Sequence, residues 1–348
     1  MIIEDWKNRI TGAASRGRTA DFRADRDRDP AGAGRWIMRI SIIVAVVCVG
    51  LGWFWSREPS IATPAPLAKP VHGVATTTAL IHVVDVLLDK PGGYLSNDIM
   101  PPGILLDNIP GWEYGVVIQV RDLAKALRES FARSQSQSTE DGDLAQAEPK
   151  FNFDHESWAL PATETEYRAG SKYLHNYLQR LVDEDQYNAQ FYTRADNLRY
   201  WLSTVESRLG SLSQRLGASV GQRRVNTDLA GDGAAKQATP SPSEKYLQTP
   251  WLELDDVFYE ARGTTWALVQ FLRAVEIDFA DVLEKKNAKI SVRQIIRELE
   301  ATQEPLWSPV VLNGSGFGLL ANHSLTMVSY ISRANAAIID LRELLAQG

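Results

Sequence analysis

Apolar and polar residues divide the chain into one continuous apolar run and a long body with periodic apolar positions. The run, WIMRISIIVAVVCVGLGWFW, extends from Trp36 to Trp55. About 20 apolar residues at 1.5 Å rise per residue cover the roughly 30 Å hydrocarbon core of a membrane, and tryptophans near both ends are typical of membrane interfaces. The pattern therefore predicts a single transmembrane helix over residues 36–55.

We interpret this run as an uncleaved signal anchor. A cleaved signal peptide has a short basic start and small residues after its apolar core. Here about 35 residues precede the run, and the bulky Trp53, Phe54 and Trp55 end it. A signal anchor leaves the rest of the chain tethered to the membrane.

The distribution of Lys and Arg predicts the orientation of this anchor. Residues 1–57 carry 10 Lys and Arg, and nine of these stand before or near the start of the run, including Arg35 and Arg39. Because cytoplasmic flanks carry the excess of Lys and Arg, we expect a cytoplasmic N-terminus and a body on the far side of the membrane.

The two flanks of the anchor are poor in large apolar residues. Residues 15–34 alternate Arg and Asp with Gly and Ala, and we predict a disordered cytoplasmic tail over residues 1–35. A short amphipathic helix over residues 1–14, with Ile2, Ile3, Trp6 and Ile10 on one face, is the alternative for its first part. Residues 56–75 are rich in Pro and Ala and predict a semi-extended spacer between membrane and body.

The body, residues 76–348, has the periodicity of helices, so the predicted fold class is all-α. A transmembrane helix would be followed by an elongated bundle with long antiparallel helices. The expected helices cover residues 76–90, 112–134 with a short strand at 116–120 as the alternative, 163–181, 191–216, 254–282, 291–302 and 322–345.

Two of these helices carry apolar residues at alternating steps of four and three, which is a heptad seam. The first seam is Phe191, Ala195, Leu198, Leu202, Val205, Leu209, Leu212 and Leu216, and the second is Leu254, Phe258, Ala261, Thr265, Leu268, Leu272, Val275, Phe279 and Val282. A polar segment, residues 222–249, predicts a disordered linker that lets the two helices lie antiparallel. A heptad pattern does not reveal whether the partner helix lies in the same chain, so a homo-oligomer formed through either seam is the alternative.

Two connections complete the body. Residues 92–112 are full of turn residues but contain six large apolar side chains, which predicts a packed connection. They are Ile99, Met100, Ile104, Leu105, Leu106 and Ile109. Residues 134–148 are polar and predict a loop.

Charge and cysteine content narrow the function classes. The net charge is −6, and since residues 1–57 carry only 6 Asp and Glu, the remainder of the chain is about −10. An acidic body without a basic stripe argues against nucleic acid as a partner. The only cysteine, Cys48, lies in the apolar run, so the body must rely on its core rather than on a disulfide.

The body shows no motif that assembles a cofactor, metal or catalytic site. None of the five histidines of the chain follows a Glu by three residues, so the di-metal motif of helical bundles is missing. Gly314-Ser315-Gly316-Phe317-Gly318 matches neither a dinucleotide nor a phosphate-binding fingerprint. We therefore predict no catalytic, cofactor-binding or metal-binding residues.

One enzymatic alternative concerns Glu156. The pair Glu156-Ser157, beside Trp158, is a two-residue match to lytic transglycosylases, in which a Glu protonates a glycosidic oxygen. The other sequence blocks of those enzymes are missing.

Several short segments resemble a bacterial family known only as domain of unknown function 2333. They are Gly92 to Asp98, Pro101 to Gly103, Ile109 to Gly115, Ser134 to Ser138 and Phe151 to Phe153. The resemblance extends from about Leu80 to the C-terminus. It implies a single-span inner-membrane protein and supplies no activity, cofactor or catalytic residue.

The leading functional hypothesis is thus a membrane-anchored, non-enzymatic envelope protein whose body binds or organises another envelope component. The alternative is a periplasmic enzyme or small-ligand binder, either acting through Glu156 or using a cleft lined by Trp112, Trp158, Trp266 or Trp307 with nearby carboxylates.

Overall fold

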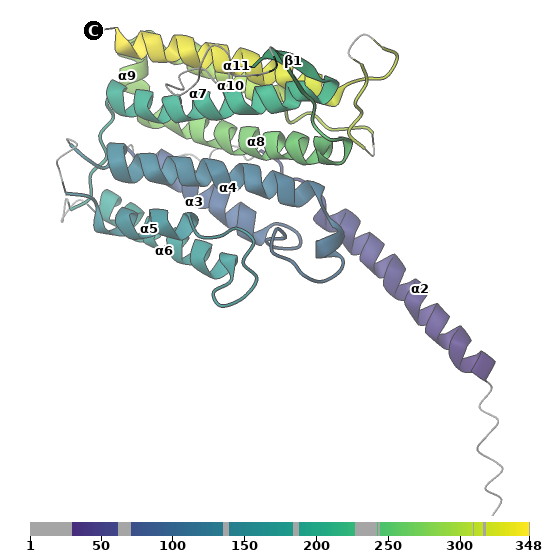
Figure 1. The fold of residues 1–348 in the computed structure, drawn as a ribbon. Helices are drawn as coiled ribbons and strands as arrows, with labels where there is room; N and C mark the ends of the chain where they lie inside the picture. The colour runs from purple at the N-terminus through teal and green to yellow at the C-terminus, as the bar shows by residue number, and fades with distance from the viewer. Residues whose placement is uncertain are drawn as a thin grey trace, which may run out of the picture. The chain divides into compact units, whose positions relative to one another are not determined.

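The apolar run forms helix α2, Pro30–Trp55, in the computed structural model of the chain (Figure 1). The chain divides into two units, Met1–Gly50 and Leu51–Gly348. The structure describes residues 30–61, 71–134, 139–183, 188–226, 242, 244–308, 310–315 and 318–347, with side chains from residue 34 onward.

The first unit contains most of α2. Its segment Gly34–Trp55, 22 residues, is long and apolar enough to cross a membrane. Large side chains such as Ile43 and Val49 are exposed, so no described part of the chain covers them. Helix α2 starts at Pro30, a residue suited to the first helical position, so the tail predicted over 1–35 is helical from residue 30. Residues 1–29 lie outside the described residues.

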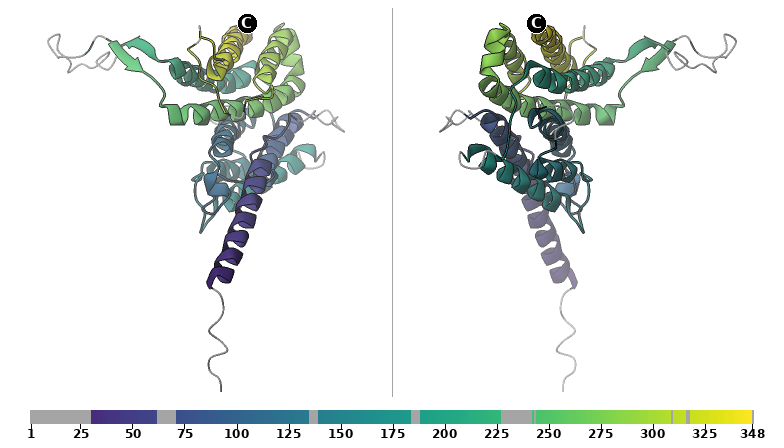
Figure 2. Two further views of the ribbon diagram at one scale, coloured as in Figure 1. Left: turned by 90° about the vertical axis from the view of Figure 1, so that its right-hand side faces the viewer. Right: turned by 90° about the vertical axis from the view of Figure 1, so that its left-hand side faces the viewer.

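The second unit is built almost entirely of helices, which confirms the all-α prediction. Helix α8 lies between α3 and α4 on one side and α7, α10 and α11 on the other, while α5 and α6 pack on α4 and α3 (Figures 1 and 2). The bounds are α3 Val74–Asp89, α4 Asn108–Ala126, α5 Gly142–Phe151, α6 Thr163–Val182, α7 Ala195–Gly217, α8 Leu254–Asp278, α9 Ala280–Lys285, α10 Lys289–Ala301 and α11 His323–Ala346. Short helical turns are η1 Gly103–Leu105, η2 Leu127–Phe131, η3 Ala218–Val220 and η4 Trp251–Glu253.

Glycines bring α4 and α8 unusually close together. A Cβ on Gly115 would collide with the carbonyl oxygen of Glu260, and a Cβ on Gly263 would collide with that of Trp112. The ring centroids of Trp112 and Trp266 lie 5.1 Å apart beside this contact, and both rings are buried. The close contact makes α4 and α8 the centre of the core. It also places residues 116–120 in a helix, so the alternative strand was wrong.

The heptad seams are buried inside this one chain. Leu198, Leu202, Val205, Leu209, Leu212 and Leu216 of the first seam are all in the core. The two seam helices run in opposite directions and touch each other, as predicted (Figure 1). However, α7 makes its largest contact with α11, and α8 makes its largest contact with α4. A heptad pattern states that a helix needs an apolar partner, but not which helix that partner is.

Two connecting segments differ from expectation. The linker predicted to be disordered over 222–249 contains strands β1, Gln222–Val225, and β2, Glu244–Leu247, which pair antiparallel. Ladder hydrogen bonds can order a polar backbone even where side chains bury little area. Residues 227–241 and 243 lie outside the described residues.

The predicted loop at 134–148 contains most of α5. The carboxylate of Asp141 caps that helix by accepting hydrogen bonds from the N–H groups of Asp143, at 3.0 Å, and Leu144, at 3.3 Å. The buried face of α5 consists of Leu144, Ala147 and Phe151. Three apolar residues are too few for a helical period to be recognised in the sequence.

Candidate functional site

The most distinctive site of the second unit is the segment that follows the apolar helix. We call residues 51–61 the junction. The ring of Trp55 packs against Gly92, where a Cβ would overlap the indole and where φ is +90°. Glycine meets both demands, since it has no side chain and adopts positive φ without strain. Ile61 also packs against the apolar core. The junction is thus attached to the body by apolar contacts.

These contacts correct the predicted spacer over 56–75. Residues 56–61 belong to the junction rather than to a free tether, and Val74 already begins α3. Residues 62–70 lie outside the described residues. The prediction rested on composition, which carries no information about contacts made with distant residues.

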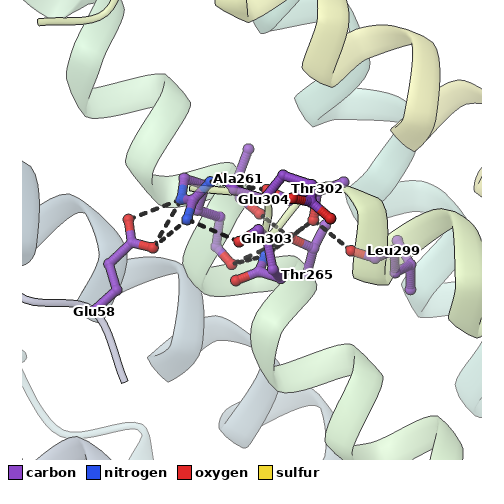
Figure 3. A network of polar contacts seen from close by, with 8 residues as sticks. Glu58, Ala261, Thr265, Leu299, Thr302, Gln303 and Glu304 are labelled. Carbon is purple, nitrogen blue, oxygen red and sulfur yellow. Dashed lines mark hydrogen bonds and ion pairs between the residues drawn. The ribbon is translucent and has the colours of Figure 1, made fainter. Parts of the chain in front are cut away.

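A buried ion pair fixes the junction to α8 (Figure 3). The guanidinium of Arg262 donates to both carboxylate oxygens of Glu58, at 2.6–2.8 Å. It also donates to the carbonyl oxygens of Thr302 and Glu304, each at 3.0 Å, just beyond the end of α10. The two side chains are only 8% and 16% exposed. Removing one partner of such a pair costs about 3–5 kcal/mol, because the other charge stays buried and uncompensated.

Hydroxyl and amide groups hold Arg262 in this position. Thr302 donates to the hydroxyl oxygen of Thr265 at 2.7 Å, and the side-chain amide of Gln303 donates to the same oxygen at 2.8 Å. The same Gln303 amide donates to the carbonyl of Arg262 at 3.1 Å. A cation at the C-terminus of a helix is favoured by the helix dipole and by unpaired carbonyls. Arg262 therefore joins three elements: the junction, α8 and the end of α10.

A second buried ion pair supports the surface on which Trp55 rests. Glu113, fully buried on α4, pairs with Lys90 at the end of α3. Its carboxylate also accepts from the N–H groups of Leu95, at 2.9 Å, and Ser96, at 2.7 Å, and from the Ser96 hydroxyl at 2.5 Å. Lys90 donates in addition to the carbonyl of Gly93. Glu113 thus attaches the turn that contains Gly92 to the core of the body.

The residues that follow extend this polar cluster toward α6. The side-chain amide of Asn97 donates to the carbonyl of Ser157 and to Glu164, both at 2.8 Å. Burial, together with the nearby Glu164, raises the pKa of Asp98. Burial raises the pKa of the Tyr94 hydroxyl well above its ordinary value, and that hydroxyl donates to a backbone carbonyl at 2.9 Å. The cluster holds the turn in place through neutral phenol and amide groups.

An exposed apolar loop continues from this cluster. We call residues 99–106 the apolar loop. Ile99, Met100, Ile104 and Leu105 are all exposed, so the packed connection predicted over residues 92–112 is wrong for this stretch, although Ile109 just after it is buried as predicted. Only Pro102 and Gly103 of the loop are buried, and Leu106 is half-buried. Apolar residues in a connection predict burial only where the same chain supplies a partner surface, which the described residues do not do here.

A polar cleft of about 510 Å³ opens between α4, α7 and α8. Both side-chain amide atoms of Gln119, which lines it, are buried and have no hydrogen-bond partner among the described residues. The two arginines that line the cleft are neutralised, Arg208 by Asp122 at 2.8 Å and Arg215 by Glu260. The lining includes the hydroxyl side chains Ser203, Thr204, Ser207, Ser211 and Thr264. The cleft is therefore polar but charge-balanced.

The four tryptophans considered as the lining of one cleft do not meet. Trp112 and Trp266 fill the core, whereas Trp158 and Trp307 are exposed. Trp307, 96% exposed, borders a separate apolar cleft of about 470 Å³. That cleft is lined by side chains that include Phe258, Leu306, Leu312, Met327 and Tyr330. A cleft combining these tryptophans with carboxylates is not formed.

Glu156 stands in an open turn after α5. Its side chain is 73% exposed and lies 3.5 Å from the imidazole of His155. General acids of glycosidases hold their proton within an apolar enclosure, and the surroundings of Glu156 provide none. Among the described residues, no group of three or more His, Cys, Asp or Glu side chains could hold a metal ion.

Sequence reasoning missed the ion pairs at the junction. Glu113 offers a recognisable signal, because it occupies an inward position of α4 between Trp112 and Val116, where a charge needs a buried partner. Glu58 and Arg262 offer none, since they are 204 positions apart in the sequence.

Three of the five segments that resemble a known family lie at this site: the first contains Gly92 in the turn, the second lies in the apolar loop, and the third contains Glu113 on α4. Neither the curated proteins nor the solved structures contain a match to the chain. A family model described as an uncharacterized protein conserved in bacteria matches residues 31–348. The chain therefore belongs to this bacterial family, DUF2333.

Proposed function

We propose that this protein is a single-span inner-membrane protein whose helical body serves as a non-enzymatic scaffold or interaction module in the periplasm. The ion pair between Glu58 and Arg262 is the observation that carries this proposal. Glu58 follows the end of the apolar helix by three residues. A body that is clamped to the segment directly after its membrane helix has no long free tether, which suits a scaffold better than a tethered enzyme.

Three further observations support membrane anchoring and orientation. The 22-residue apolar segment of α2 matches the thickness of a bilayer core at about 1.5 Å per residue. The Arg57 guanidinium lies 4.1 Å from the ring centre of Trp53, a pairing that suits the headgroup level. The excess of Lys and Arg before the helix supports a cytoplasmic N-terminus.

Trp307 is the position at which we expect a protein partner. Exposed tryptophans beside apolar pockets are typical of the residues that dominate binding energy at interfaces. The apolar cleft beside Trp307 has room for a side chain of a partner. An envelope protein that inserts an apolar side chain there would be bound to the anchored body.

Anchoring and orientation are tested in cells that express the full chain. We expect the protein to stay in the membrane pellet after carbonate extraction. A C-terminal alkaline phosphatase, active only outside the cytoplasm, should be active. A C-terminal reporter that works only inside the cytoplasm would reverse the orientation, and release by carbonate would contradict the anchor.

The scaffold role is tested by a photo-crosslinking amino acid at position 307, with position 290 as the control. Trp307 and Ile290 are both strongly exposed, but Ile290 lies at the start of α10, away from the cleft. We expect a discrete crosslinked envelope protein from position 307 and none from position 290. Identical crosslinking at both positions, or none at either, would contradict a partner site at Trp307.

A small-ligand binder is the second candidate function, because the unpaired amide of Gln119 borders the polar cleft. Buried amides normally have partners, so this one favours a bound polar group. Since the arginines of the cleft are neutralised, the ligand class would be a neutral polyhydroxyl molecule. A thermal-shift panel of neutral mono- and disaccharides tests it: a rise in melting temperature that Gln119→Leu abolishes supports binding, and no rise opposes it.

A further inference from the structure

The apolar loop, residues 99–106, is an uncovered apolar surface with no charged residue inside it. Ile104 is 56% exposed and Leu105 is 72% exposed. Ile99 and Met100 are exposed beside them. Contiguous exposed apolar side chains mark contact with a protein or a membrane. The question is which of the two covers this loop.

The position of the loop against α2 favours the membrane. A Cβ on Gly52 would lie 3.5 Å from the side chain of Leu106 and 3.7 Å from that of Pro102, so the loop touches α2 at Gly52. Gly52 lies inside the apolar segment that ends at Trp55. A 22-residue helix is about 33 Å long and a bilayer core is about 30 Å thick, so Gly52 lies near the edge of the hydrocarbon region. The contact therefore holds the loop at that depth.

The backbone of the loop is suited to a medium poor in water. The N–H groups of Ile104, Leu105 and Leu106 donate to carbonyls within the loop at 2.9–3.2 Å. Pro101 and Pro102 have no N–H group to satisfy. Backbone donors without partners are costly near hydrocarbon, and five of the eight residues of this loop present none.

Acidic residues limit how deep the loop can enter. Asp98 precedes it and Asp107 follows it, and carboxylates remain at the headgroup level or above. The stretch between them has the length for a shallow contact and not for a second span. The arrangement resembles a short interfacial segment whose apolar face enters the boundary between headgroups and acyl chains.

We propose that residues 99–106 insert into the membrane leaflet in which α2 ends and form a second, shallow lipid contact. This inference rests on the membrane anchoring proposed above. One helix alone lets a body tilt and rotate about its axis. A second contact beside Gly52 determines which face of the body is turned toward the bilayer.

The test uses the full chain in phosphatidylcholine nanodiscs. Cys48→Ala removes the single cysteine, and a new cysteine at Leu105, Val44 or Ile290 carries an environment-sensitive NBD fluorophore. All three positions are exposed in the structure, so the label should leave the fold intact. Val44 reports the anchor. Ile290, a matched exposed apolar residue at the start of α10, reports a part of the body away from the loop.

We expect NBD emission at position 105 to shift to the blue and to be quenched by lipids that carry a shallow spin label. Position 44 should be quenched by deep spin labels, and position 290 by neither. If the label at position 105 is quenched as little as the label at position 290, while the label at position 44 is quenched, the loop does not insert but the anchor is retained. Failure of quenching at 44 would overturn the anchor itself.

Protection by protein is distinguished in the same samples. If the label at 105 is shielded from aqueous iodide but not quenched by spin-labelled lipids, a partner protein or a second copy covers the loop, and the lipid contact is wrong. A double variant, Ile104→Ser with Leu105→Ser, provides a second measurement. We expect the double variant to keep its near-ultraviolet circular dichroism. A label at position 100 in this variant should no longer be quenched by lipids that carry the shallow spin label.

Discussion

Replacement of Glu113 by glutamine should destabilise the body far more than a change of one atom suggests. Glu113 is fully buried and accepts hydrogen bonds from Lys90, from two backbone N–H groups and from the Ser96 hydroxyl. A glutamine keeps the shape of the side chain, but it removes the negative charge and turns one acceptor into a donor that faces the Ser96 N–H. The Lys90 ammonium then stays buried without a counter-charge.

The magnitude follows from these contacts. Loss of one partner of a buried ion pair costs about 3–5 kcal/mol. Domains are stable by roughly 5–15 kcal/mol, so Glu113→Gln should remove a third or more of the free energy of unfolding. Lys90→Met should cost less, because the Glu113 carboxylate retains three hydrogen bonds whereas Lys90 alone retains only the carbonyl of Gly93.

The assay is urea unfolding of the full chain in detergent, followed by the fluorescence of the buried Trp112 and Trp266. The double variant, Lys90→Met with Glu113→Gln, removes both charges and should be more stable than Glu113→Gln alone. A loss below about 1 kcal/mol for Glu113→Gln, or a double variant no better than that single variant, would refute the reasoning about a compensated buried charge.

Three further predictions concern other parts of the body. Gly263→Ala should force α4 and α8 apart and cost roughly 1–3 kcal/mol in urea unfolding, whereas Gly142→Ala, with open space around it, should change little. Gln119→Leu should stabilise the protein by about 1–3 kcal/mol, because an apolar side chain replaces an unpaired amide; destabilisation would show that the amide has a partner. Burial lowers the pKa of His323 below 6.5, and its ring accepts a hydrogen bond from the Leu312 N–H at 3.0 Å. The unfolded state therefore binds a proton at His323 more tightly than the folded state. The contribution of neutral His323 to the free energy of unfolding is complete above pH 6.5 and is lost as the pH falls through the lowered pKa. His323→Gln should flatten the dependence of stability on pH in this range.

Local patterns in the sequence determined the elements of this protein. The apolar run predicted the end of α2 at Trp55, and the step of four and three predicted the inward face of α7, because a helix presents every third or fourth residue to one side whatever it packs against. Turn residues at Pro91, Gly92 and Gly93 correctly ended α3 near Asp89. Such signals depend on neighbours a few residues away, so the chain itself contains them in readable form.

The tertiary structure decided which elements meet, and with that it decided the candidate site. Glu58 and Arg262, far apart in sequence, form their ion pair only when the junction, α8 and α10 come together. The same holds for the pairing of α7 with α11 and for the exposure of the loop at Ile104 and Leu105. Apolar patterns state that a surface must be covered. Only the packed chain shows which surfaces it covers itself and which, like residues 99–106, it leaves open beside the end of the apolar helix.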